Sequence, residues 1–234
     1  MKYDQWMRVA SAEYARILTL LRDLDENEWA TLTDCDPWTV RDMVAHLIGQ
    51  AEATASIREQ LRQLRAGNTH KGDGELMPAV NSAQISARSG LSSIERVDLL
   101  ADAAARGVRA RSALPAAVRM LQLPLPAPWR WTSFGYLYGP IYTRDAWVHR
   151  IDICAATGRE MVLTAEHDGL IVADLVAELG AGSGKGRGAN VDLTGPAGGH
   201  FGTGSALAYD AIEFCRALAG RSSIDDVEPA MALF

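Results

Sequence analysis

The chain has 234 residues, of which 48% are hydrophobic and 22% charged, and its formal net charge at pH 7 is -6. This composition argues against a disordered chain and is typical of a globular protein with one large or two small domains. Because phosphate contacts depend on clustered Lys and Arg, the negative charge and the lack of a basic run in the sequence argue against nucleic acid as a partner.

The cysteines and the hydropathy pattern indicate the compartment. Cys35, Cys154 and Cys215 form neither a Cys-x-x-Cys pair nor an even framework, which favours reduced thiols. No uncharged apolar stretch approaches the ~20 residues that span a bilayer, and charges interrupt the N-terminus where a secretory signal has its apolar run. We therefore expect a cytoplasmic protein without a membrane partner, as a monomer or a homodimer.

Apolar residues at helical spacing predict a first amphipathic helix over residues 3–23. An irregular stretch follows, and two patterns compete to start the next helix. Asp36 can cap a helix that has Pro37 at its first position, or Thr39 can cap one with Asp42 three residues later. Either start predicts a long helix directly afterwards.

The second helix is expected to continue to about Arg65 and to end at Gly67. The polar, Gly-rich residues 67–78 are typical of a loop. A third helical region follows over about residues 80–114, with a break near Gly90.

Residues 114–139 hold four Pro and two Trp, and we expect an ordered, irregular crossover packed on the helices. Pro140 suits the first turn of a fourth helix, which Gly158 ends. Four helices with a long connection before the last one predict a helical bundle over residues 1–160.

Residues 161–234 have a different pattern. We expect a helix over residues 165–179, a strand and turn in VDLTGPAGG, and a last helix over about residues 205–219. The Gly-rich GAGSGKGRGAN follows a helix and lacks the Ser or Thr of a phosphate-binding loop after its Lys, so we interpret it as a flexible loop. The fold class is then α+β, a four-helix bundle followed by a small α/β C-terminal domain.

Three side chains predict a metal centre on the bundle. Asp145 and His149 are four residues apart on the fourth helix, so both project from one face. His46 flanks the apolar stripe of the second helix and is the best third ligand, since the remaining histidines fall in a loop or in the second domain. Asp152 continues the stripe of His149 and can orient its imidazole. Two imidazoles and one carboxylate leave coordination positions open, which is typical of catalytic zinc and also occurs with non-heme iron.

Other interpretations of these residues stay open. An Asp/His pair at this spacing is also typical of a surface ion pair, and a histidine beside an apolar stripe is often a half-buried core residue. Cys35 lies between two Asp residues, which disfavour its thiolate, and we expect a structural or incidental role. The aromatic residues of the crossover either line a substrate pocket or belong to the core; they are Trp129, Trp131, Phe134, Tyr136 and Tyr138.

Three segments resemble one family in the right order and spacing. WATLTDCDPWTVRDMVAHLIG, residues 29–49, is similar to the signature of the N-terminal domain of mycothiol-dependent maleylpyruvate isomerases, a branch of the DinB-like metalloenzyme superfamily. TRDAWVHRIDICAATGRE, residues 143–160, resembles the second signature of that family, and residues 191–222 resemble its small C-terminal domain. The resemblance implies a DinB-like bundle over residues 1–160 and a small α/β domain over residues 161–234.

The resemblance also implies roles for single residues. The metal-binding residues of the family fall on His46, Asp145 and His149. Its catalytic arginine falls on Arg221, where a guanidinium suits a substrate carboxylate. The maleylpyruvate isomerases themselves carry Glu where this chain has Asp145, so the resemblance implies a metal site and does not fix the substrate.

The cofactors that the resemblance implies are a divalent metal, with Zn2+ as the first choice, and mycothiol, a low-molecular-weight thiol of actinobacteria. Coordination to a divalent ion deprotonates a thiol, whose pKa is otherwise about 8.5. The thiolate then adds to a small electrophilic substrate and either leaves again, as in an isomerase, or stays attached, as in an S-transferase. The alternatives are a metalloenzyme that uses another thiol or water, and a non-catalytic DinB-like protein that binds a small molecule or a protein.

Overall fold

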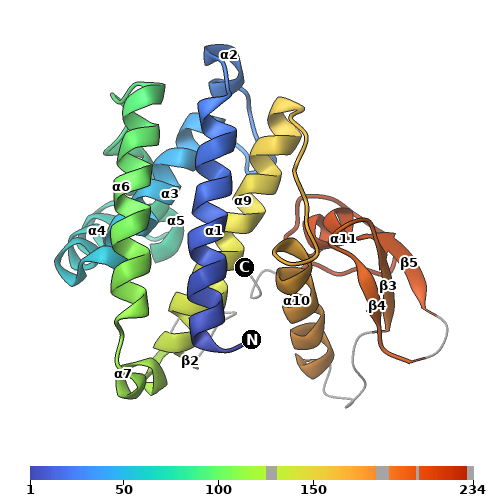
Figure 1. Ribbon diagram of the computed structural model, residues 1–234. Coiled ribbons are helices and arrows are strands. Elements are labelled where there is room, and N and C mark those ends of the chain that lie inside the picture. Colours follow the sequence, from blue (N-terminus) through green and yellow to red (C-terminus); the bar gives the residue numbers. More distant parts are fainter. Residues whose placement is uncertain (125–130, 183–189, 204–205, 231–234) are drawn as a thin grey trace.

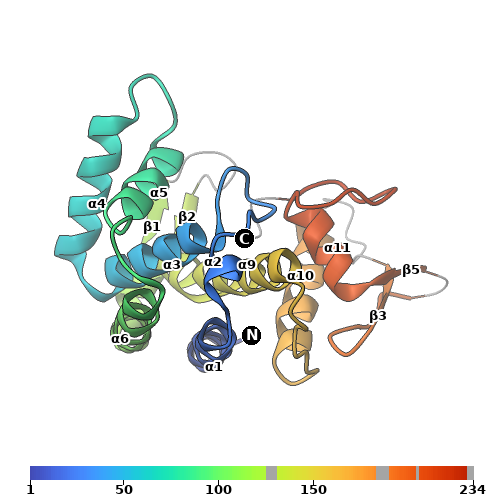
Figure 2. The same cartoon turned by 90° about the horizontal axis from the view of Figure 1, so that it is seen from above.

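A computed structural model describes residues 1–124, 131–182, 190–203 and 206–230. A mainly helical N-terminal part is followed by a smaller region with two helices and a mixed three-stranded sheet (Figure 1). This arrangement confirms the predicted α+β class. Seen from above, the smaller region lies on one side of helix α9 (Tyr142–Thr157), and helices α4 (Ile57–His70) and α5 (Leu76–Ser86) lie on the other (Figure 2).

Four long helices form the N-terminal bundle: α1 (Tyr3–Arg22), α3 (Val40–Ala55), α6 (Ser93–Ser112) and α9. The short helix α2 (Glu26–Trp29), which the sequence pattern did not predict, precedes α3. α3 begins at the second of the two predicted caps, because Thr39 accepts a hydrogen bond from the Asp42 amide and the Asp42 side chain accepts one in return. α3 packs closely on α6, since a Cβ on Gly107 would stand 2.8 Å from the Ala51 carbonyl oxygen.

The prediction of one long second helix as far as Arg65 is wrong, because the helix ends at Ala55 and a new one begins after Ser56. Ser56 has extended backbone dihedrals, and its hydroxyl accepts a hydrogen bond from the Glu59 amide as the N-cap of a separate helix, α4 (Ile57–His70). Because no Gly or Pro stands at this position, the apolar spacing continues from one helix to the next and the sequence predicts a single helix.

Helix α4 continues through the predicted stop at Gly67, where a Cβ would stand 2.4 Å from the Val80 side chain. The glycine is needed for close packing on α5 (Leu76–Ser86), which begins inside the predicted loop. The break predicted near Gly90 is confirmed, since α6 starts only at Ser93.

The crossover is ordered in the described residues and contains four short elements. These are α7 (Ala116–Met120), β1 (Gln122–Pro124), β2 (Trp131–Ser133), which pairs antiparallel with β1, and α8 (Phe134–Tyr136). A π-helical segment, Leu137–Ile141, then leads directly into α9. The prediction that Pro140 lies in the first turn of the fourth helix is wrong, since α8, this segment and α9 follow one another without a gap and Pro140 lies inside that helical run. There its missing N–H interrupts the α-helical hydrogen-bond pattern, which becomes regular only after it. Gly158 ends α9 as predicted, with a φ of 67°.

The smaller region consists of α10 (Asp168–Gly182), β3 (Val191–Thr194), β4 (Gly199–Phe201), β5 (Leu207–Asp210) and α11 (Ala211–Leu218). β3 is central, antiparallel to β4 and parallel to β5. The helix predicted from residue 205 is wrong at its start, because Asp210 ends β5 and caps α11 by accepting hydrogen bonds from Ile212 and Glu213. Most of the Gly-rich GAGSGKGRGAN lies outside the described residues.

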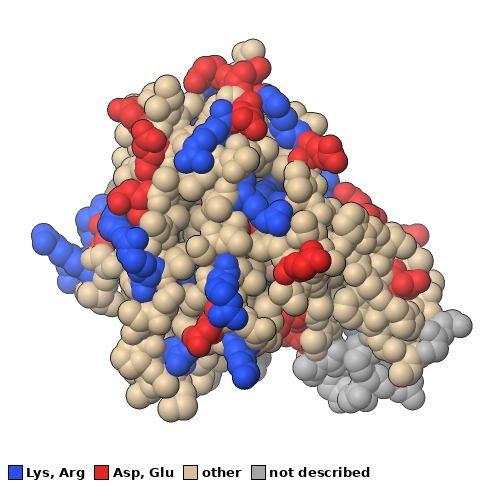
Figure 3. Space-filling model, in the orientation of Figure 1, with Lys and Arg blue, Asp and Glu red and all other residues tan. Residues whose placement is uncertain are grey.

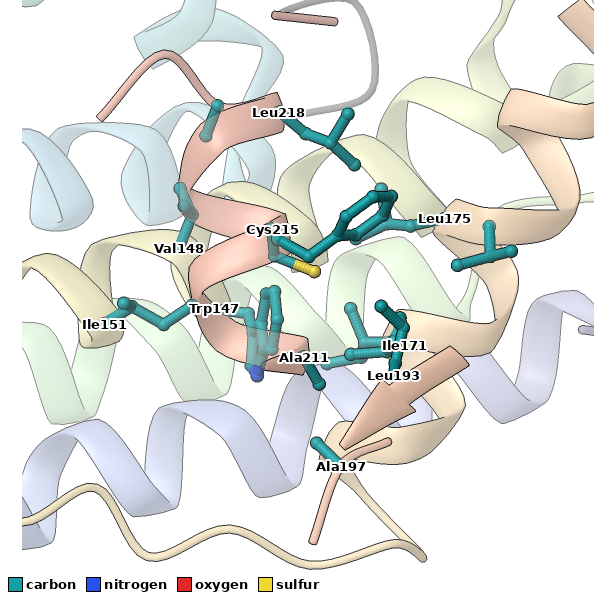
Figure 4. Close-up of a cluster of buried hydrophobic side chains, with 14 of the residues drawn as sticks. Trp147, Val148, Ile151, Ile171, Leu175, Leu193, Ala197, Ala211, Cys215 and Leu218 are labelled. Carbon is teal, nitrogen blue, oxygen red and sulfur yellow. The ribbon is translucent and has the colours of Figure 1, made fainter. Parts of the chain in front are cut away.

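A continuous apolar core joins the two regions. Trp147 and Val148 of α9 pack with Leu175 of α10, Leu193 of β3 and Cys215 of α11 (Figure 4). Burying each large apolar side chain contributes about 1.5–3 kcal/mol, so this core fixes the sheet region on α9. The boundary at residue 160 stays a prediction.

The charged side chains of both signs are interspersed over the face shown in Figure 3. No single-sign patch covers this face. Within the described ranges, no helix is both long and apolar enough to cross a membrane.

Candidate metal centre

The structure brings His46, Asp145 and His149 together from two helices. His46 lies about two turns into α3, Asp145 in the first turn of α9, and His149 one turn later. The histidines are buried, with 6% and 4% of their surface exposed, whereas Asp145 remains partly accessible. Trp38 packs beside both imidazoles, with ring centroids 5.2 Å from His46 and 6.2 Å from His149.

The atoms that would bind a metal already face one another. His46 Nε2 is 3.6 Å from Asp145 Oδ2, and His149 Nε2 is 3.7 Å from Asp145 Oδ1. Both separations are longer than a good hydrogen bond. Two ligand atoms about 2.1 Å from one tetrahedral ion stand about 3.4 Å apart, which is close to these separations. The donor set and its spacing therefore fit one divalent ion.

A chain of side-chain amides fixes the proton on His46. Gln63 donates a hydrogen bond to the Gly49 carbonyl, 2.9 Å, so its oxygen is left to accept one from Gln84, 2.7 Å. The Gln84 oxygen must then accept the Nδ1 proton of His46, at 2.8 Å. His46 therefore presents the lone pair of Nε2 to the site, as a metal ligand requires.

The carboxylate of Asp152 orients His149 as the Gln84 amide orients His46, by holding the proton on Nδ1. His149 Nδ1 lies 3.1 Å from Asp152 Oδ2, so the Nδ1 proton is held there and Nε2 faces Asp145. Arg221 in turn donates to Asp152, 3.3 Å and 3.4 Å, and to the Ala219 carbonyl, 2.6 Å. The structure thus places Arg221 behind His149, on the side away from Asp145.

The charges of Asp145 and His149 shift the pKa values of one another. Burial alone would raise the pKa of Asp145, but His149 and His46 beside it hold that pKa well below its usual range. Burial would lower the pKa of His149, but Asp145 and Asp152 together raise it to about 10. Without a metal, a proton on His149 therefore supplies the positive charge that the carboxylates require.

A cavity of about 470 Å³ opens beside this group and has His46, Gln50 and Asp145 among its lining residues. Its other walls come from α4, α5, β1, α8, the π-helical segment and the start of α9, and they are mostly apolar. This volume suits a small organic ligand. An ion held by His46 and Asp145 would therefore lie beside this cavity.

The sequence analysis left open whether the aromatic residues of the crossover line a pocket or belong to the core, and the structure shows different environments for them. Phe134 lines the cavity, whereas Trp131 is 70% exposed and does not. The hydroxyls of Tyr136 and Tyr138 bond to Glu178 and Gln60 respectively, and neither tyrosine is among the residues that line this cavity. Trp129 lies outside the described residues.

The sequence analysis did not predict Gln84 or Gln63 at the site, and it gave Cys35 a structural or incidental role. The Cys35 thiol lies 3.0 Å from Arg221 and 3.5 Å from Asp152, directly behind His149. No pattern in the sequence points to these contacts, because their partners are far apart along the chain. Cys35, His149 and Asp152 also lie close enough to hold an ion, but the guanidinium of Arg221 already supplies a cation there.

The fold and this cluster define a helical-bundle protein with a candidate metal centre. The sequence profile of the Mycothiol maleylpyruvate isomerase N-terminal domain matches residues 10–154, and the chain belongs to this family. Two solved structures share the fold: a crystal structure of the mycothiol-dependent maleylpyruvate isomerase and one of a histidine-to-alanine mutant of it. Each is 18% identical, with a TM-score of 0.62 over 95% of this chain and 91% of the other. No curated protein sequence gives a significant match.

Proposed function

We propose that this protein is a metal-dependent enzyme that uses a low-molecular-weight thiol, mycothiol in the first instance, to attack a small electrophile. The observation that supports the proposal is the convergence of two imidazole Nε2 atoms and one carboxylate beside a cavity that His46 and Asp145 help to line. Three protein ligands with an open side are the catalytic form of a zinc site. Membership of a family named for a mycothiol enzyme supports the choice of thiol.

A divalent ion held by His46, Asp145 and His149 would supply a Lewis acid that lowers the pKa of a bound thiol. The chain itself contributes orientation and charge. Asp145 would neutralise part of the ion's charge, while the amide chain behind His46 and Asp152 behind His149 hold the two Nδ1 protons, so that both Nε2 atoms are turned toward the ion.

Arg221 acts in this proposal as a positioning residue. Its guanidinium is hydrogen-bonded to Asp152, and it is not among the residues that line the cavity. This placement differs from the substrate-carboxylate contact expected from the resemblance. Whether the thiol leaves again, as in an isomerase, or stays, as in a transferase, depends on the substrate and not on the three ligands.

The experiment combines metal analysis with a thiol assay. Protein purified without chelator is assayed with mycothiol, glutathione or no thiol on benzylideneacetone, and both cis–trans isomerisation and thiol adduct are measured. We expect one equivalent of metal and turnover with mycothiol. The variants His46→Ala and His149→Ala should lose both, whereas His70→Ala, on the exposed side of α4, should keep both.

A wild-type protein without stoichiometric metal contradicts the enzyme proposal and favours the non-catalytic alternative. A metal-loaded protein whose reaction is the same without thiol favours a metalloenzyme that uses water. Equal rates with glutathione leave the metal chemistry and remove mycothiol as the specific partner.

A further inference from the structure

Tyr142 has a hydroxyl without a partner at the wall of the cavity. It lies in the first turn of α9, on the same helix face as Asp145 one turn later and His149 two turns later. The residue is half-buried and is one of those that line the cavity. Its ring packs edge-on against Tyr138, with ring centroids 5.4 Å apart, and this contact holds the phenol in place.

The hydroxyl is both unpaired and accessible. Within residues 1–124, 131–182, 190–203 and 206–230 it makes no hydrogen bond, and Asp145 on the same face accepts one from Gln50 instead. In this part of the chain it is also not one of the fully buried oxygens that lack a partner, of which Gln50 Oε1 is an example. Because the ordinary pKa of tyrosine is about 10, the phenol keeps its proton at neutral pH and can donate a hydrogen bond to a molecule in the cavity.

The proposed thiol chemistry needs such a donor. When a thiolate adds to the β-carbon of an α,β-unsaturated carbonyl compound, the electrons of the C=C bond move toward the carbonyl oxygen and give an enolate. His46, Asp145, His149 and the thiolate would together complete a tetrahedral coordination shell, and the two anions would balance the charge of a divalent ion. The enolate oxygen then requires a hydrogen-bond donor outside that shell.

The position of Tyr142 favours it over the other donors of the cavity. Gln60 and Asn81 also bring amide N–H groups to the wall, but they belong to α4 and α5. Tyr142 belongs to the helix that supplies two of the three candidate ligands, and its Cβ lies about 5–6 Å from that of Asp145. A small electrophile attacked beside Asp145 can therefore contact the Tyr142 hydroxyl at the same time.

We infer that Tyr142 is a catalytic residue whose hydroxyl donates a hydrogen bond to the carbonyl oxygen of an α,β-unsaturated substrate and stabilises the negative charge that thiolate addition places there. This inference rests on the proposed function for the thiol and adds a residue that acts on the electrophile. In isomerisation, the enolate electrons rebuild the C=C bond after rotation and expel the thiolate. In transfer, the α-carbon takes up the proton that the thiol lost, and the C–S bond remains. Tyr142 keeps its own proton in both reactions.

Binding of a coloured enone tests this contact without turnover. The para-dimethylamino derivative of benzylideneacetone absorbs at longer wavelength when its carbonyl oxygen accepts a hydrogen bond. It is titrated into the metal-free, full-length protein in the absence of thiol. We expect Tyr142→Phe to weaken binding about fivefold, the value of one hydrogen bond, and to move the absorption of the bound molecule to shorter wavelength.

Tyr138→Phe is the matched control. It removes the same atom from the neighbouring ring, whose hydroxyl is bonded to Gln60, and it should leave both affinity and absorption unchanged. Infrared spectra add a measurement that needs no variant, because the carbonyl stretch of benzylideneacetone bound to the wild-type protein should lie at lower wavenumber than in an aprotic solvent.

Kinetics then test the catalytic role. With Zn2+ and mycothiol, Tyr142→Phe should lower kcat on the order of 100-fold, as the loss of one oxyanion donor does, while KM changes only by the factor seen in binding. Tyr138→Phe should keep both constants.

Equal absorption and affinity of the bound enone in wild type and Tyr142→Phe overturn the inference, and so does a wild-type carbonyl stretch that matches the aprotic solvent. Failure of the proposed function gives a different result. A protein without a thiol reaction that still shows the Tyr142-dependent shift contradicts the proposed function and keeps the carbonyl contact. A thiol-active enzyme whose kcat is unchanged by Tyr142→Phe overturns the inference alone.

Discussion

Two groups of histidine and acidic side chains involve α9, one that includes two residues of this helix and one that is bonded to its Arg150, and they differ in the contacts that hold them together. In the first, His46, Asp145 and His149, the facing polar atoms are 3.6 and 3.7 Å apart and lie beside a cavity. The second group, Glu13, His167 and Asp168, is also close enough for a metal. Its carboxylates are instead bonded at 2.6 Å to a cation that the chain provides.

That cation is Arg150 of α9, which bonds to both Glu13 and Asp168 and is 3% exposed. Burial would raise the pKa of Asp168, but Arg150 lowers it again. His167 completes the group by bonding to Glu13 at 2.6 Å. Proximity of ligand-type residues is therefore a weak criterion for a metal site, and the presence of a built-in guanidinium separates a structural ion cluster from a candidate centre.

The largest expected effect is the difference in metal content between variants that lose a histidine of the first group and of the second group. His149→Ala should abolish stoichiometric metal binding, because a divalent ion keeps only two protein ligands. His167→Ala, an equally buried histidine of the second group, should leave the metal content unchanged. Metal analysis after gel filtration measures both. Metal lost from His167→Ala, or retained by His149→Ala, would reverse the assignment of the two groups.

Arg150→Met should have the opposite effect to His149→Ala, because it should lower the stability of the fold and leave the metal content unchanged. Without the guanidinium, Glu13 and Asp168 are buried without their cation, and we expect a loss of about 3–5 kcal/mol in the free energy of unfolding. Urea denaturation measures the loss, and metal content per folded protein should stay the same. A small effect on unfolding would mean that water or a bound cation replaces Arg150.

Gln84→Leu should weaken metal binding by about 10–100-fold, since the Nδ1 proton of His46 loses its acceptor. Gly49→Ala should have a similar effect without changing the amide, because its Cβ would stand 2.5 Å from Gln84 Cγ. Gln60→Leu is the matched control, a glutamine of the cavity wall whose side chain accepts a hydrogen bond from Tyr138. Competition against a zinc indicator dye gives the affinities, and equal effects of all three changes would rule out the amide chain as the cause.

Metal affinity should rise with pH by about tenfold per unit between about pH 7 and pH 9. The pKa of His149 is raised to about 10 in the metal-free protein, so the residue is protonated throughout this range and the ion must displace that proton. As pH rises, the proton competes less and binding tightens. Calorimetry in buffers of different ionisation enthalpy counts the released protons, and a flat affinity would show that His149 is already neutral.

Much of the fold was predictable because local signals decide it. The apolar spacing of α1, the Thr39 capping box and Gly158 each fix an element boundary through neighbouring residues. The break at Ser56 and the strand before Asp210 were missed, because there the local pattern fits a helix and tertiary packing decides the outcome.

In the candidate site, too, local patterns predicted some residues and missed others. Asp145 and His149 share one helix face, which spacing predicts. His46 was the best third ligand because it flanks the apolar stripe of its helix, and the resemblance to a family implied the same three residues. The partners of these residues were not predictable, because Gln84 lies 38 residues from His46 and Cys35 lies 117 residues from Asp152. Such contacts depend on how α3, α5 and α9 are docked, which no local pattern encodes.

The amide chain behind His46 begins and ends on the same helix, since His46 and the Gly49 carbonyl both belong to α3, while the two glutamines between them come from α4 and α5. The pair α4 and α5 also forms a wall of the cavity. The tautomer of a metal ligand is thus set by the same two helices that shape the space for the substrate. A change that remodels this wall for a new substrate also acts on the basicity of His46, so the two properties do not vary independently.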